Sequence, residues 1–188
     1  MPDGSRPQPG TSTSLVNLPN IITFGRLCAV PLAFWLVLEH RMNDAFWLFV
    51  AAGLSDALDV WLARRYGGNA VGALMDPVAD KALLVTMYIT LAAVGALPAW
   101  LAILVVFRDV LIVGGIVVLA VLGHAVTIRP LYISKWNTVM QIVLIAACLL
   151  FGGFGLGIPH LLDVLTWCVA TTTLASGAAY VWNTARGK

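Results

Sequence analysis

The sequence predicts an all-α membrane protein, a bundle of six transmembrane helices with both termini on the cytoplasmic side. Of its 188 residues, 60% are apolar and only 11% are charged, and the mean hydropathy is +0.91. Such values lie far outside the range of soluble domains, so lipid is the expected solvent. The length suits a single domain, and we find no internal repeats.

Six stretches are long and apolar enough to cross a bilayer, which takes about 20 residues in a helix. Helices are expected because, in lipid, each backbone amide of such a run must be bonded within its own segment. Glycine, proline and charged residues separate the stretches. The expected spans are residues 20–39, 44–65, 77–96, 98–122, 134–153 and 159–183.

The basic residues of the short loops predict the orientation, because Lys and Arg collect on the cytoplasmic side. With the N-terminus inside, the outer loops hold only Arg41, and all other loop cations face the cytoplasm. Residues 1–17, rich in Pro, Gly, Ser and Thr, are expected to form a disordered tail before a membrane domain of residues 18–185. The net charge of +2 is small and scattered, which argues against nucleic acid as a partner.

Four of the nine acidic residues are clustered, in the runs DALDVWLAR (residues 56–64) and GALMDPVAD (residues 72–80). Spacings of three and four place each pair of aspartates on one helix face, and a hairpin would bring the two pairs together. Carboxylates so close in a bundle need cations to compensate them, and oxygen ligands favour hard ions. We therefore expect Mg²⁺ or Mn²⁺, with two ions suited to four carboxylates, bound by Asp56, Asp59, Asp76 and Asp80.

Other roles for the four aspartates stay open. Asp76 precedes Pro77, which is typical of a helix N-cap followed by proline at the first helical position. The acids could also pair with Arg64, Arg65 and Lys81. Neither explains Asp56 and Asp59, which lie inside an apolar helix. A membrane cation transporter would use acids to line an ion path, but those are expected near the bilayer midplane rather than toward its cytoplasmic end.

This stretch resembles the signature of the CDP-alcohol phosphatidyltransferases, D-x2-D-G-x2-A-R followed by G-x3-D-x3-D. The resemblance implies a metal-dependent transfer of a phosphatidyl group from CDP-diacylglycerol to an alcohol, with Asp80 as the catalytic base. It also implies a homodimer in the inner membrane with its active site facing the cytoplasm. The nucleotide would be bound by Asp56, Asp59, Val60, Ala63, Arg64 and Gly72.

Several cations outside the signature are candidates for an acceptor or phosphate pocket. Arg26 could pair with an aspartate, bind a lipid phosphate or snorkel to the interface. Arg108 and Asp109 interrupt an apolar run. Because neighbours do not share a helix face, we expect more than a local ion pair, with one side chain pointing into the bundle. Arg129 and Lys135 either bind phosphate at a helix N-terminus or anchor the loop at the inner face.

Three further segments resemble the CMP-forming cardiolipin synthases of this family: FRDVLIV, RPLYISKWNTVMQ and TWCVATTTLASGAAYVW. By that resemblance the acceptor is phosphatidylglycerol, a membrane lipid, and the products are cardiolipin and CMP. Phosphatidylglycerophosphate synthases share the signature and use glycerol 3-phosphate. Charge and spacing do not decide between these two acceptors.

Val60 stands where the family signature has glycine. In the family this glycine lies beside the cytidine nucleotide, where the absence of a side chain allows close approach to the backbone. We predict that Val60→Gly raises the activity or the affinity for CDP severalfold. Steady-state kinetics on the two proteins check this, and identical kinetics would contradict it.

Overall fold

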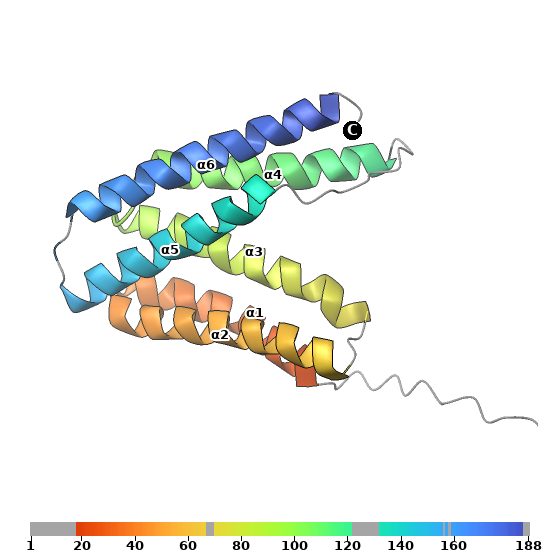
Figure 1. The fold of residues 1–188 in the computed structure, drawn as a ribbon. Coiled ribbons are helices and arrows are strands. Elements are labelled where there is room, and N and C mark those ends of the chain that lie inside the picture. The colour runs from red at the N-terminus through yellow and green to blue at the C-terminus, as the bar shows by residue number, and fades with distance from the viewer. Residues whose placement is uncertain (1–17, 67–69, 122–131, 156, 158, 186–188) are drawn as a thin grey trace, which may run out of the picture.

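A computed structural model describes the backbone of residues 18–66, 70–121, 132–155, 157 and 159–185. Within these ranges it leaves undescribed the side chains of residues 18–24, 56–57, 59–66, 70–79, 116–117, 119–120, 159 and 183–185. The described chain folds into helices without strands, as predicted (Figure 1). They are α1 (Leu18–Leu38), α2 (Met42–Tyr66), α3 (Ala70–Ala93), α4 (Ala99–Val121), α5 (Tyr132–Phe154) and α6 (Pro159–Ala185). The predicted tail, residues 1–17, lies outside the described residues.

Helix α3 begins earlier than the sequence pattern indicated. It starts at Ala70 rather than at residue 77, so Asp76 and Pro77 both lie inside the helix. The prediction that Asp76 caps the helix is therefore wrong. The preceding run AVGALM contains alanine, leucine and methionine, which favour a helix. Pro77 lies beyond the first turn, where its missing N–H and its ring disturb the bond to the carbonyl four residues earlier. Asp76 lies about 9 Å along the helix from its first residue.

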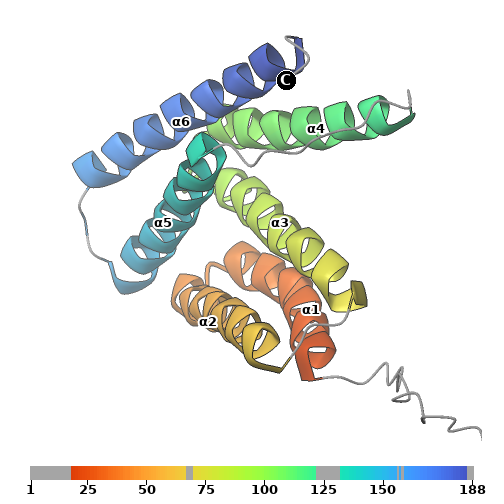
Figure 2. The ribbon, with the colours of Figure 1, turned by 45° about the vertical axis from the view of Figure 1, so that its right-hand side comes forward.

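The helices pack around α3 and α5. Helix α3 contacts α1, α4 and α5, while α5 contacts α2, α3 and α6, and α4 lies along α6. Figure 2 shows α1 and α2 side by side, with α3 running alongside α1 on the side away from α2. Helices α2 and α3 each pack against α1, so α1 is the common support for the two helices that carry the four aspartates.

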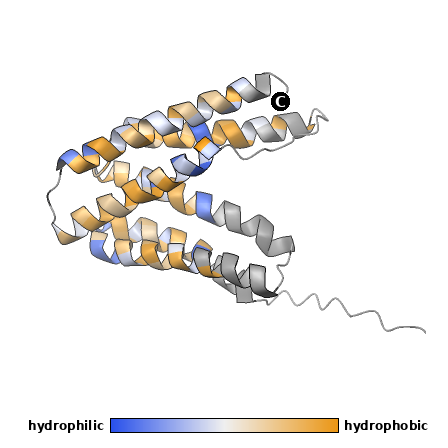
Figure 3. Cartoon of the chain, viewed as in Figure 1, coloured by the Kyte–Doolittle hydropathy of each residue, from blue (hydrophilic) through white to orange (hydrophobic). Residues whose placement is uncertain are grey.

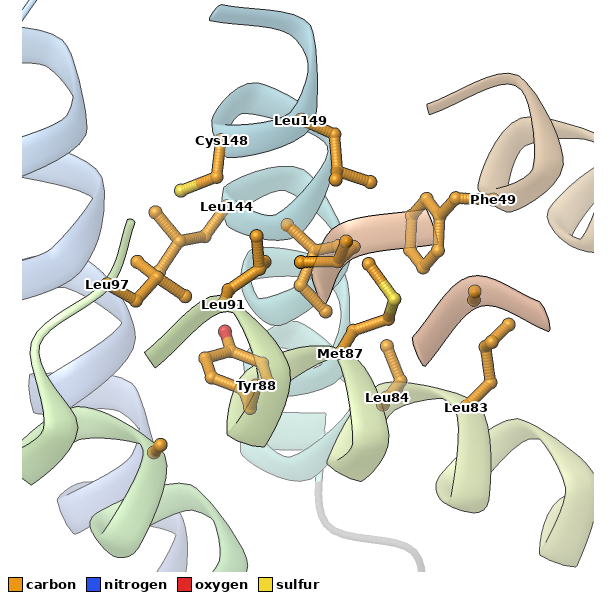
Figure 4. Close-up of a cluster of buried hydrophobic side chains, with 14 of the residues drawn as sticks. Phe49, Leu83, Leu84, Met87, Tyr88, Leu91, Leu97, Leu144, Cys148 and Leu149 are labelled. Carbon is orange, nitrogen blue, oxygen red and sulfur yellow. The ribbon is translucent and has the colours of Figure 1, made fainter. Parts of the chain in front are cut away.

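The interior of the bundle is apolar and closely packed. Met87, Tyr88 and Leu91 of α3 are fully buried, and Figure 4 shows them gathered with Leu144 of α5 and Phe49 of α2. Leu97, Leu101 and Val105 extend the same core toward α4. The C-terminal half of α3 therefore contributes residues to the core. Its N-terminal half is left to make polar contacts.

Most residues of the described helices are apolar (Figure 3). Large apolar side chains are exposed on several helices, including Trp47, Ile103, Phe107 and Trp167. In the described part of the chain, Tyr132–Phe154 and His160–Trp182 are long and apolar enough to cross a membrane. The shortest helix, α1, has 21 residues and is about 32 Å long. Crossing by all six helices, and the side on which the termini lie, stay predictions.

Helix α5 meets the start of α2 at very short range. A Cβ atom at Gly153 would lie 2.7 Å from the backbone nitrogen of Asn43 and 2.8 Å from its Cα. Both are backbone atoms, which cannot turn aside as a flexible side chain can. Glycine is therefore required at this helix contact.

We predict that Gly153→Ala lowers the stability of the protein by about 1–3 kcal/mol, because the helices must move apart. Thermal unfolding in detergent measures the effect. The matched control is Gly53→Ala in α2, where no atom lies within 4 Å of the added Cβ. That control should keep or raise the melting temperature, since alanine suits a helix better than glycine by about 1 kcal/mol. Equal losses in both variants would contradict the close contact.

Candidate active site

Asp80 of α3 is held by Arg26 of α1. The Nη1 of Arg26 donates a hydrogen bond to Asp80 Oδ1 at 2.7 Å, and the Arg26 side chain is only 1% exposed whereas that of Asp80 is 39% exposed. A buried guanidinium needs a counter-charge in an apolar bundle. Of the three possibilities for Arg26, pairing with an aspartate is the one observed, and snorkelling to the interface is excluded by its burial.

The other three aspartates are placed by their helices alone. Asp56 and Asp59 lie in α2, ten and seven residues before its end at Tyr66. Asp76 and Asp80 lie in α3, six and ten residues after its start at Ala70. At the helical rise of about 1.5 Å per residue, both pairs therefore lie at matching depths, roughly 9–15 Å from the ends joined by residues 67–69.

A divalent-metal site stays a prediction for these four residues. The side chains of Asp56, Asp59 and Asp76 lie outside the described part, and among the described side chains no three acids, histidines or cysteines come together. The set of donors, all carboxylate oxygens, suits Mg²⁺ or Mn²⁺. The side chains of the predicted nucleotide-binding residues Val60, Ala63 and Arg64 in α2 also lie outside the described part, and Gly72 is placed only by the backbone of α3.

A second ionic group, which we call the basic cluster, consists of Lys81, Arg108 and Asp109. The Nζ of Lys81 donates to both carboxylate oxygens of Asp109, at 3.0 and 2.9 Å, and the Nη1 of Arg108 donates to Asp109 Oδ1 at 2.7 Å. Arg108 and Asp109 do form a local ion pair, although neighbours point in different directions on a helix. The long arginine side chain spans that difference. The expectation of contacts beyond the local pair is confirmed, because both residues also bind other helices.

Arg108 joins three helices. Its Nη2 donates to Ser134 Oγ of α5 at 2.8 Å and to Ser176 Oγ of α6. Arg108 therefore points into the bundle, as expected. Ser176 was not singled out from the sequence, because a lone serine in an apolar helix carries no signal of its own.

Helix α5 also carries two amide side chains, those of Asn137 and Gln141, inside the bundle. Asn137 and Gln141 are fully buried. The Oδ1 of Asn137 accepts hydrogen bonds from Thr172 at 3.0 Å and Thr173 at 2.8 Å. Within the described part, Asn137 Nδ2 and both polar atoms of the Gln141 side chain have no partner. A buried polar group without a partner costs about 1–3 kcal/mol, so these atoms call for one.

The structure brings together only some of the residues that were predicted to form the acceptor pocket. Asp80 and Lys81 are consecutive in α3, so the Arg26–Asp80 pair and the basic cluster meet on that helix. Lys135 is instead exposed, with its Nζ 5.9 Å from the centre of the Tyr132 ring. Arg129 lies outside the described residues.

The described helices thus form an apolar bundle in which the buried cations Arg26 and Arg108 lie beside carboxylates. Residues 16–176 match the family model of the CDP-alcohol phosphatidyltransferases. The chain therefore belongs to the CDP-alcohol phosphatidyltransferase family.

Three relatives of the chain carry two different enzyme names. The chain is 37% identical over 190 residues to the chloroplastic CDP-diacylglycerol–glycerol-3-phosphate 3-phosphatidyltransferase 1 of Oryza sativa, covering 91% of this chain and 58% of the relative. It is 32% identical over 180 residues to the CMP-forming cardiolipin synthase of Rattus norvegicus, covering 87% and 60%. A CDP-diacylglycerol–glycerol-3-phosphate 3-phosphatidyltransferase of Cereibacter sphaeroides is 31% identical over 176 residues, covering 87% and 76%. The chain thus spans about three fifths of the length of the first two.

We predict that Arg26→Met lowers the stability by about 1–3 kcal/mol, between the values typical of exposed and of buried ion pairs, because Asp80 is partly exposed. Thermal unfolding in detergent measures it. The control is Arg41→Met, which removes the exposed pair of Arg41 with Asp44. This change should cost at most about 1 kcal/mol. A larger loss in the control than in Arg26→Met would contradict the assignment.

Proposed function

We propose that this chain is a membrane enzyme that transfers a phosphatidyl group from CDP-diacylglycerol to a hydroxyl of phosphatidylglycerol, giving cardiolipin and CMP. Membership of the CDP-alcohol phosphatidyltransferase family is the observation that carries the proposal. The matching depths of the two aspartate pairs in α2 and α3 support it. We further propose that the protein acts as a homodimer in the inner membrane.

The bundle would lie in the membrane with all six helices crossing it. Its helices have 21 residues or more, and large apolar side chains cover the outside of the described part. The positive-inside rule then puts the ends that carry the four aspartates at the cytoplasmic face. CDP-diacylglycerol would enter from the inner leaflet.

The four aspartates, Asp56, Asp59, Asp76 and Asp80, would hold Mg²⁺ or Mn²⁺, and two ions suit four carboxylates. When bound, such ions neutralise charge on the phosphate oxygens and on the departing nucleotide.

Asp80 is the proposed general base. Its carboxylate would take the proton from the acceptor hydroxyl, whose oxygen attacks the phosphorus attached to diacylglycerol. The bond between that phosphorus and the oxygen of CMP breaks, and CMP leaves. Arg26, bonded to the Asp80 carboxylate at 2.7 Å, would hold it in place before the acceptor arrives. Arg108 would bind the phosphate of the acceptor.

A phosphatidylglycerophosphate synthase is the alternative, with glycerol 3-phosphate as acceptor. The relatives from Oryza sativa and Cereibacter sphaeroides, whose names carry that substrate, favour it. A cation transporter is disfavoured by the basic cluster, because Lys81 and Arg108 would repel cations from the interior of the bundle.

The test is to incubate the purified protein in detergent micelles with CDP-diacylglycerol and Mg²⁺. Phosphatidylglycerol, glycerol 3-phosphate and inositol phosphate are offered separately, and the lipid product is identified. We expect cardiolipin and CMP from phosphatidylglycerol, and no reaction after chelation of the metal. Absence of CMP with every acceptor would overturn the proposal.

In the same assay, Asp80→Asn should leave a folded protein whose turnover is about 10²–10⁴-fold lower, the usual contribution of a general base. Asp44→Asn is the control, since it makes the same chemical change at the exposed pair with Arg41 and should keep full activity. Substantial residual turnover of Asp80→Asn would rule out its role as the base.

A further inference from the structure

The basic cluster has an unequal balance of charge. It contains two cations, Lys81 and Arg108, and one anion, Asp109, which binds both at 2.7–3.0 Å. The side chains of Arg108 and Asp109 are only 5% and 10% exposed. The side chain of Lys81 is 40% exposed. The described cluster therefore carries a net charge of one positive unit, made up of a buried Arg108–Asp109 pair and a partly exposed lysine.

Next to this charge lie polar atoms that need partners. Arg108 Nε, Asn137 Nδ2 and Gln141 Nε2 are buried donors without an acceptor among the described residues, and Gln141 Oε1 is a buried acceptor without a donor. Ser134, Asn137 and Gln141 follow one another at spacings of three and four on α5, so they share one face of that helix. Ser134 binds Arg108 at 2.8 Å, which brings this face to the cluster.

We propose that the basic cluster and the amides of Asn137 and Gln141 form the subsite that chooses the acceptor, selecting a glycerol group joined through a phosphodiester over a free phosphate monoester. The inference rests on the proposed function and names residues that decide between its two acceptors. Arg108 binds the phosphate of the acceptor, and the two amides bind its glycerol hydroxyls. Hydroxyl groups both donate and accept, as the unpartnered donors and acceptor of the two amides require.

Charge is the reason for the choice. A phosphodiester carries one negative charge, whereas a phosphate monoester carries about 1.5–2 at pH 7. One net positive charge balances the diester and leaves the monoester with buried, uncompensated charge, which is costly in an apolar bundle. Asp109 is therefore a positioning residue that also sets the charge: without it the cluster would carry two positive units.

The experiment offers phosphatidylglycerol and glycerol 3-phosphate together, with CDP-diacylglycerol and Mg²⁺, and measures the ratio of cardiolipin to phosphatidylglycerophosphate. This ratio does not depend on the fraction of folded protein. The wild type should favour cardiolipin, and Asp109→Asn should lower the ratio about tenfold, as expected when a charge match is changed at a buried site. Asp109→Glu, which keeps the charge, should keep the ratio of the wild type.

The control for the charge change is Asp44→Asn, at the exposed pair with Arg41, which should not move the ratio. The amides are tested by Asn137→Ala and Gln141→Leu. Each should raise the KM for phosphatidylglycerol severalfold while the KM for CDP-diacylglycerol stays unchanged. A purely structural role would instead change both values or neither.

Several outcomes would overturn the inference while phosphatidyl transfer stands. They are a wild type that prefers glycerol 3-phosphate, an unchanged ratio in Asp109→Asn, and loss of both products in Asp109→Asn. An unchanged KM for phosphatidylglycerol in both amide variants would show that water satisfies those groups. Absence of CMP release from the wild type with either acceptor would instead remove the proposed function itself.

Discussion

The carboxylate of Asp109 is the contact on which the polar interior of this bundle depends. It holds Lys81 of α3 and Arg108 of α4, and Arg108 in turn binds Ser134 of α5 and Ser176 of α6. Each of these charges alone would be expensive among apolar helices. A buried ionic group of this kind adds little net stability compared with apolar packing. Its contacts join α3, α4, α5 and α6.

Helix α3 connects this arrangement to the aspartates. Asp80 and Lys81 follow each other along the helix, and consecutive side chains point about 100° apart. Asp80 reaches Arg26 of α1, while Lys81 reaches Asp109 of α4. One pair of residues thus links the helices α1–α3, which carry the proposed metal ligands, to α4–α6, which carry the proposed acceptor subsite. A shift of α3 along its axis would disturb both ion pairs together.

The sequence was sufficient for features that depend on composition and on local pattern. The number of helices followed from apolar runs, and the family followed from the spacing of four aspartates in α2 and α3. The start of α3 was misplaced because Asp76–Pro77 is a strong local signal for a helix start, while the helix formers before it give a weaker one. The partners of Arg26 and Arg108 depend on which helices are neighbours. That information lies in the packing of α3 against α1 and α4, and no spacing within one helix contains it.

The relatives carry two enzyme names, and the difference between these names indicates which kind of group selects the acceptor. The two names differ in the acceptor or product they state, while the family is the same. Attack on the phosphorus of CDP-diacylglycerol is common to both reactions, so carboxylates that serve this step cannot discriminate between acceptors. Discrimination needs groups that respond to the charge and hydroxyls of the acceptor. In the described part of the bundle, buried charge and polar atoms without partners coincide at Arg108, Asn137 and Gln141, which lie in α4 and α5. In the proposed reaction, residues of α4 and α5 would therefore decide the acceptor, and the aspartates of α2 and α3 would serve the chemistry at phosphorus.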